Sequence, residues 1–90
     1  WIPVVNSPNS LRSEVGHELL KRHPRAPFVG MWSIDAGGWQ GWSLRSRGDF
    51  DVSALAASLG GGGHMAASGF RLPPGEWILA PLGEAPDFSD

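Results

Sequence analysis

Two polar motifs contain the residue types best suited to chemistry. Residues 60–63 are all glycine and are followed directly by His64, and a Ser-Leu-Arg-Ser motif upstream contains Arg45. Consecutive glycines are entropically costly to order, and their bare N–H groups can form a concave anion-binding nest. An arginine guanidinium matches phosphate as a planar fork of donors, and a histidine can donate to phosphate or stack on a base. These residue types predict phosphate binding. A plain surface linker is the alternative interpretation of the glycines.

The residues needed for catalysis are absent from the sequence. No lysine follows the glycines as a phosphate-binding loop requires, and no His-Glu-x-x-His motif occurs. The three histidines lack the spacing of a zinc site, and no nucleophile elbow is present. Nothing provides the clustered ligands of a two-metal hydrolytic site. We therefore expect this chain alone to be catalytically inactive and to hold no cofactor.

Composition limits the class of protein. The chain has 90 residues, 41% hydrophobic and 18% charged, which is typical of one small globular domain. It has no cysteine, hence no disulfide framework or thiolate metal site. The net charge of −2 means that an anion must be bound locally rather than by an overall basic field. No apolar run approaches the roughly 20 residues of a membrane span, so we expect no membrane partner and a cytoplasmic location. Because the chain opens on Trp1, we interpret it as a domain of a longer polypeptide.

Periodicity and turn residues predict an alternation of strands and helices. A helix is expected with Ser13 as its N-cap and Pro24 as its stop. His64 is expected to open one helical turn after the glycine run. The expected strands are 2–5, 27–35, 39–47 and 69–72, and the expected helices are 13–23 and 51–59. Residues 76–82 fit a strand or a helix equally well, and 83–90 should be a frayed tail.

These elements predict a single small α/β domain with helices packed on a mixed sheet and a Gly-rich loop after the second helix. Residues 27–47 form a hairpin, and residues 39–72 read as a strand–helix–strand crossover. Alternation in the strand 39–47 places Arg45 on one face with Gly41, Ser43 and Arg47. If the crossover returns beside this strand, the glycine amides, His64 and Arg45 converge.

Each of these site residues has a structural alternative. Arg45 could form an internal salt bridge with Asp49 or Asp51. His64 could pack under the edge of the sheet and donate to a carbonyl. Either arrangement would remove the side chain from ligand binding, and the residue types do not decide between them.

Three motifs together resemble a known family. The segments SLRS at 43–46, DVSALA at 51–56 and GGGGHMAASGF at 60–70 resemble the C-terminal DHH-associated domain of the DHH phosphoesterases. The resemblance covers about residues 2–72, and one departure is Ser68 where the family usually has alanine. It implies a manganese-dependent hydrolase whose metal site lies in a separate N-terminal DHH domain, absent from this chain. That domain would be a partner within the same polypeptide.

The resemblance also implies site residues and ligands. The substrate-binding residues carried over are Arg45, Ser46, Gly61, Gly62, Gly63 and His64. The implied ligand is a short single-stranded oligonucleotide or a nucleoside phosphate, because members of the superfamily include oligoribonucleases, bisphosphate-nucleotide phosphatases and RecJ-like exonucleases. A non-catalytic RNA-binding module of the alanyl-tRNA synthetase kind is the alternative, although His64 favours the phosphoesterase branch. A plain α/β interaction domain is a third interpretation.

Overall fold

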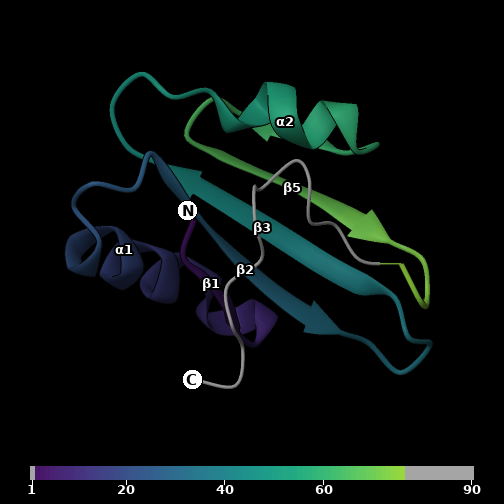
Figure 1. Ribbon diagram of the computed structural model, residues 1–90. Helices are drawn as coiled ribbons and strands as arrows, with labels where there is room; N and C mark the ends of the chain where they lie inside the picture. Colours follow the sequence, from purple (N-terminus) through teal and green to yellow (C-terminus); the bar gives the residue numbers. More distant parts are fainter. Residues whose placement is uncertain (1, 77–90) are drawn as a thin grey trace.

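The fold is a five-stranded mixed sheet with one helix on each face (Figure 1). The computed structural model describes residues 2–76 of the chain, so the segment 76–82 and the tail 83–90 lie almost wholly outside the described residues. The elements are β1 (Val4–Asn6), the 3-10 helix η1 (Asn9–Leu11), α1 (Arg12–Arg22), β2 (Phe28–Ile34), β3 (Gln40–Ser46), α2 (Val52–Ser58), β4 (Gly62–His64) and β5 (Ala67–Leu72). No helix in this part of the chain is long and apolar enough to cross a membrane.

The strand order β1-β2-β3-β5-β4 confirms the mixed α/β class and corrects the topology. β1 and β2 are parallel and are connected through α1, whereas β5 runs antiparallel to β3. The crossover expected over residues 39–72 is therefore wrong. The reason is that β4 and β5 form a hairpin around a turn at Met65 and Ala66, which reverses the chain. His64 ends a strand and does not open a helical turn.

The face of the sheet that α2 covers holds the hydrophobic core. Trp42 and Leu44 of β3 and Phe70 of β5 pack with Val52 and Ala56 of α2. Leu44, Val52 and Ala56 are fully buried, and burying a large aliphatic side chain contributes about 1.5–3 kcal/mol. Asp51 caps α2 by accepting a hydrogen bond from the Ser53 amide at 2.8 Å. Apolar burial thus fixes α2 on this face.

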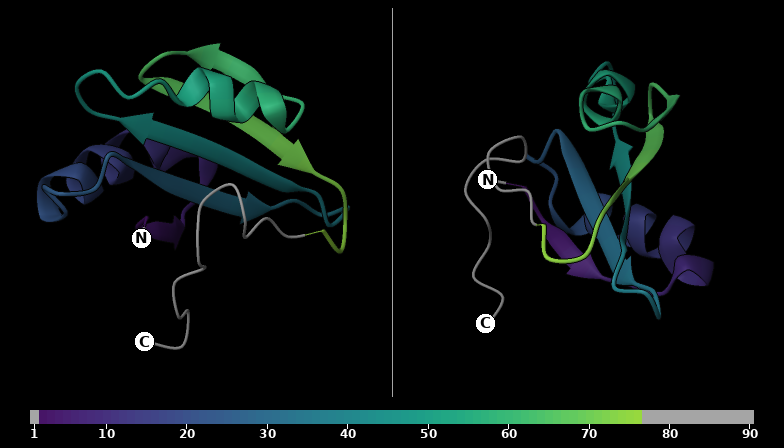
Figure 2. Two further views of the ribbon diagram at one scale, coloured as in Figure 1. Left: turned by 45° about the horizontal axis from the view of Figure 1, so that its top comes forward. Right: turned by 90° about the vertical axis from the view of Figure 1, so that its right-hand side faces the viewer.

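Helix α1 packs on the other face, over β2 and β3 only (Figure 2). The closest approach is at Gly16, where an added Cβ would lie 2.9 Å from Arg45 Cγ and 3.0 Å from Met31 Cε. The predicted Ser13 cap is wrong, because η1 leads directly into the helix and places Ser13 inside it with no side-chain cap at Leu11. No described helix covers β4 and β5 on this face, so the sheet is half open there.

Arg47 fastens the end of α1 to the sheet. Its guanidinium donates to the carbonyl oxygens of Leu20 and His23, the latter at 2.8 Å, and its Nε donates to Ala26 O at 3.0 Å. A cation at these carbonyls also complements the negative end of the helix dipole. Arg47 therefore lies on the α1 face, as Arg45 does, but it has a structural role at the end of the helix.

Candidate anion-binding face

Strand pairing brings Arg45 and His64 to the same face of the sheet. Arg45 is paired with Ala67 of β5, and Ala67 is paired with His64 of β4. Directly opposite residues in antiparallel strands point to the same face. Since neighbouring strands lie about 4.8 Å apart, the two Cα atoms are about 10 Å apart with only the Ala67 methyl group between them. The strand pairing therefore places these two side chains near each other on one face, as expected.

The Arg45 guanidinium carries a charge that no carboxylate neutralises within the described residues. Its stem lies against Gly16, and its two amino groups make long contacts of 3.4 Å with Leu44 O and Ser13 Oγ. The alternative of a salt bridge with Asp49 or Asp51 does not occur in this part of the chain. The cation is therefore available to an external anion.

His64 is exposed, and its ring makes no hydrogen bond within residues 2–76. Its backbone is fixed by the β4–β5 pairing, and its carbonyl accepts a hydrogen bond from Ser68 Oγ at 2.6 Å. The side chain does not pack beneath the sheet edge. It therefore stands free on the same face as Arg45.

The first two glycines of the run do not form an anion-binding nest. The Gly60 amide donates to Ala57 O at 3.1 Å, and the Gly61 amide donates to Ala56 O at 2.8 Å. Gly60 has φ of 88°, the left-handed conformation that ends α2. The end of α2 uses these two amides, so Gly60 and Gly61 do not contribute to the expected nest.

Of the last three glycines of the run, two are required by packing and one is not. A Cβ at Gly61 would lie 2.0 Å from Gly69 O, and a Cβ at Gly63 would lie 2.7 Å from Ala67 O. Gly62 has open space around the corresponding position. It is paired with Gly69, which is paired with Ser43, so these three residues form a row without bulk beside the Arg45–His64 row.

The structure does not bring Ser46 to this face. Ser46 is buried on the α2 side, and its hydroxyl oxygen lies 2.7 Å from Phe50 O and 3.3 Å from Met65 O. These contacts hold the loop before α2 against the β4–β5 turn. Its neighbour Arg45 points to the opposite face, as strand alternation requires.

Arg12 is the functional candidate that the sequence did not reveal. Its side chain is 8% exposed. Nη1 donates to Ser43 Oγ at 2.9 Å, and Nη2 donates to Ser33 Oγ at 2.6 Å and to Gly41 O at 2.8 Å. Burial, and then the neighbouring Arg45 charge, lower the pKa of Arg12. The available signal was the pair of small residues Gly41 and Ser43 on the face of Arg45, because they make room for the Arg12 guanidinium.

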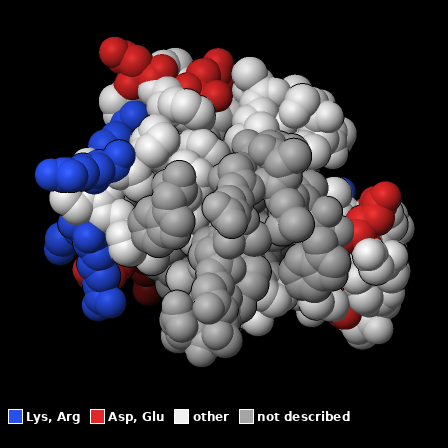
Figure 3. All heavy atoms as spheres, in the orientation of Figure 1, with Lys and Arg blue, Asp and Glu red and all other residues white. Residues whose placement is uncertain are grey.

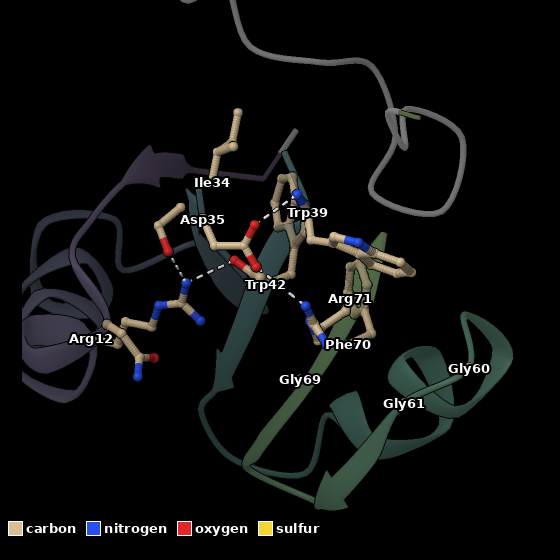
Figure 4. A pocket seen from close by; sticks show the side chains of 13 residues that line it. Arg12, Ile34, Asp35, Trp39, Trp42, Gly60, Gly61, Gly69, Phe70 and Arg71 are labelled. Atoms are coloured by element: carbon tan, nitrogen blue, oxygen red, sulfur yellow. Dashed lines mark hydrogen bonds and ion pairs between the residues drawn. The ribbon is translucent and has the colours of Figure 1, made fainter. Parts of the chain in front are cut away.

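A hollow of about 880 Å³ opens beside Arg12. Arg12 reaches it from α1, and Arg71 of β5 reaches it from the other side (Figure 4). Arg71 lies 3.3 Å from Asp35 Oδ2 and stacks over the Trp39 ring at 4.8 Å. In Figure 3 the visible Lys and Arg side chains gather mainly at the left edge, the end of the molecule at which α1 is drawn in Figure 1. The face thus combines cations, donors and an aromatic ring.

Comparisons with known sequences give two related proteins. The chain is 41% identical over 66 residues to uncharacterized protein R106 of Acanthamoeba polyphaga mimivirus, covering 71% of this chain and 15% of that protein. It is 41% identical over 61 residues to oligoribonuclease NrnB of Bacillus subtilis (strain 168), covering 67% and 14%. The chain therefore spans about 15% of the length of these curated relatives. No protein-family model matches the sequence.

Solved structures share the fold. An uncharacterized protein from Helicobacter pylori G27 matches with a TM-score of 0.58 and 30% identity over 77% of this chain and 19% of its own. An exopolyphosphatase-related protein from Bacteroides fragilis matches at 0.55 and 23%, over 77% and 23%. The pGpG-specific phosphodiesterase PggH from Vibrio cholerae matches at 0.52 and 17%, over 60% and 20%. The last two show the fold alone. The oligoribonuclease among the relatives agrees with the resemblance found in the sequence motifs.

Proposed function

We propose, since the chain is a DHH-associated domain, that its open sheet face binds the phosphate of a nucleotide for a phosphoesterase. The observation that carries the proposal is the row Arg45–Ala67–His64. It presents a guanidinium and an imidazole side by side, with no carboxylate paired to either in the described residues. The oligoribonuclease among its relatives supports a nucleotide as the ligand.

The row would hold a phosphate by charge-assisted hydrogen bonds. Arg45 donates to phosphate oxygens from one side and His64 donates from the other, and the methyl group of Ala67 leaves the space between them open. Such bonds are shorter and stronger than neutral ones. Gly62 and Gly69 would let a sugar–phosphate backbone lie close to the strands. The chain's own contribution is to bind and orient its ligand.

Hydrolysis would take place outside this chain. Residues 2–76 contain no group of three His, Asp or Glu side chains that could hold a metal ion. The residues described here therefore do not fit the manganese that the family resemblance implies. We assign that metal to a separate DHH domain of a longer polypeptide and treat residues 1–90 as one substrate-binding domain.

A short single-stranded oligonucleotide or a nucleoside phosphate is the ligand class that fits best, in a cytoplasmic phosphoesterase. The site is an open face of a small domain with scattered cations rather than the broad basic surface of a duplex-binding protein. A non-catalytic RNA-binding module of the alanyl-tRNA synthetase kind is not favoured, because the curated relative with a stated activity is an oligoribonuclease.

The test is titration of the isotope-labelled chain with AMP, followed by amide shifts. Arg45→Ala should weaken binding about tenfold, because a hydrogen bond to a charged group is worth about 1.5–3 kcal/mol. His64→Ala should weaken it less. Arg25→Ala is the matched control, because Arg25 is an exposed arginine in the loop between α1 and β2. Equal losses for Arg25→Ala and Arg45→Ala would mean that AMP responds only to net charge, and the proposal would fail.

A further inference from the structure

We propose that the hollow beside Arg12 is a second anion subsite, which takes the phosphate of a second nucleotide and places its base against Trp39. The hollow lies on the same face as Arg45 and His64. The proposal rests on the proposed function, because it extends that function's ligand by a second nucleotide. The subsite is lined by residues of α1, β3 and β5, by the hairpin between β2 and β3, and by Gly60 and Gly61 after α2. The ligand chemistry is a phosphate ester carrying an aromatic base.

The first argument is an unbalanced buried charge. Arg12 is more than nine-tenths buried, yet its three hydrogen-bond acceptors are two hydroxyl groups and one carbonyl, all neutral. Within residues 2–76 its Nε has no hydrogen-bond partner and no carboxylate lies within 4.0 Å of the side chain. Buried charges in folded proteins are normally paired. The site is therefore short of an anion.

The second argument is that the acid nearest the hollow is already used. Asp35 forms an ion pair with Arg71 and accepts hydrogen bonds from the amides of Gly37 and Trp39 at 2.9 and 3.0 Å. Arg71 and Asp35 therefore balance each other across the hollow, whereas Arg12 faces it without a counterion. An incoming phosphate would supply the missing charge.

The third argument is the floor that joins the two subsites. Gly41 is paired with Arg71, and a Cβ at Gly41 would lie 3.3 Å from Arg12 Nη2, so the glycine makes room for the guanidinium. The next row on this face contains Ser43 and Gly69, and the row beyond contains Arg45. Successive rows are about 7 Å apart. In β3, β5 and β4 this row contains only Ser43, Gly69 and Gly62, while its β2 residue, Met31, is buried beneath α1. A nucleotide chain can therefore pass from one cation to the other over β3 and β5.

The fourth argument is the aromatic ring at the rim of the hollow. Trp39 is 40% exposed although it is a large apolar side chain, and Arg71 lies over its ring. Proteins that bind single-stranded nucleic acids stack bases on such rings and use arginine in the same way. An exposed tryptophan beside an unpaired buried arginine points to a base and a phosphate together.

A purely structural role for Arg12 is the competing explanation. Its contacts with Ser33, Gly41 and Ser43 tie the start of α1 to β2 and β3. A purely structural role predicts that substitution of Arg12 lowers stability without changing the affinity of the folded chain for its ligand. A subsite predicts a selective loss for the longer ligand.

The experiment compares AMP with the 5′-phosphorylated dinucleotide pApA at low salt, by calorimetry and amide shifts on this chain. The wild-type chain should bind pApA more tightly than AMP and shift amides of Arg12 and Trp39 only with pApA. Arg12→Gln keeps two donors for the neutral acceptors and removes the charge. It should weaken pApA at least tenfold and change AMP by less than twofold. Trp39→Ala should weaken pApA several-fold, and Arg25→Gln should change neither.

Other outcomes overturn the subsite. If folded Arg12→Gln binds pApA like the wild type, Arg12 is only a tie. If it weakens AMP and pApA by the same factor, there is one site and not two. If Arg12→Gln fails to fold, Trp39→Ala provides the same test. A loss of affinity for pApA alone supports the subsite, and an equal loss for AMP and pApA overturns it. Failure of the proposed function is recognised separately, because Arg45→Ala would then leave both ligands unaffected.

Discussion

The two faces of the sheet are built from the same strands but differ in chemistry. On the α2 face β3 presents Trp42 and Leu44, and Trp42 stacks on Phe70 with ring centroids 5.8 Å apart. On the α1 face the intervening residues are Ser43 and Arg45, which face Gly69 and Ala67 of β5 on one side and the buried Met31 and Val29 of β2 on the other. Because side chains alternate along a strand, one segment supplies both a hydrophobic core and a polar surface. Stability and ligand binding should therefore separate by face.

The arginines show the same division within one residue type. Arg47 donates to carbonyls at the end of α1 and completes the fold. Arg45, two residues earlier, makes only long contacts, and Arg12 is buried among neutral acceptors. The number and charge of a guanidinium's partners thus distinguish structural arginines from those available to an anion.

The largest effect should come from the core face. Leu44→Ala removes a fully buried side chain and should lower the free energy of unfolding by about 2–5 kcal/mol. Urea denaturation followed by tryptophan fluorescence measures it. After correction for the folded fraction, AMP affinity should be unchanged. A loss of affinity beyond that correction would mean that the two faces are not energetically separate.

The same substitution at Arg47 and at Arg45 should distinguish a structural arginine from a ligand-binding one. Arg47→Gln should lower the free energy of unfolding by about 1–3 kcal/mol, since it weakens charged hydrogen bonds to three carbonyls. Arg45→Gln should change it by less than about 0.5 kcal/mol, as surface substitutions do, while weakening AMP about tenfold. Thermal melts of both variants measure the change in stability, and AMP titrations measure the change in affinity. The reverse pattern would assign Arg45 to the fold.

Gly63 and Gly62 make a similar pair in the edge strand. Gly63 has φ of 145° and no room for a Cβ, so Gly63→Ala should cost about 1–2 kcal/mol or more of stability. Gly62→Ala meets open space and should leave the melting temperature nearly unchanged. Its new methyl group would stand in the row between Arg45 and the Arg12 hollow, so pApA should bind several-fold more weakly. Unchanged pApA affinity in Gly62→Ala would place the ligand away from this row.

Sequence patterns predicted the parts of the molecule that local rules control. Alternation identified β2 and β3, and the spacing of Val52 and Ala56 identified α2. The glycine–histidine segment was harder, because β4 has three residues and exists only through pairing with β5. The open face itself follows from alternation at Arg45. Its pairing with His64 depends on the register between strands distant in sequence.

Arg12 could not be predicted for a similar reason. Its role depends on where α1 begins, and Ser13 is a better N-cap by type than Leu11, which stands at that position. The 3-10 turn Asn9–Leu11 shifts the helix start by one residue and directs Arg12 onto the sheet. Helix boundaries are the least determined feature of a sequence, so a residue whose function depends on one is missed.

The smallest effect should be a pH dependence at the start of α2, away from both anion subsites. Hydrogen bonds from the Ser53 side chain and then from its amide lower the pKa of Asp51. The ionised carboxylate therefore stabilises the folded state above its unfolded pKa of about 3.9, and this contribution is lost as the pH falls through the lower folded pKa. Asp51→Asn keeps a capping side chain but cannot titrate, so its melting temperature should fall less than that of the wild type between pH 5 and about 2.5. Thermal melts of the two proteins across that range measure the difference. AMP affinity at pH 7 should be the same for both, because the cap lies at the start of the helix on the core face; identical acid profiles would show that Asp51 is not held by Ser53 in solution.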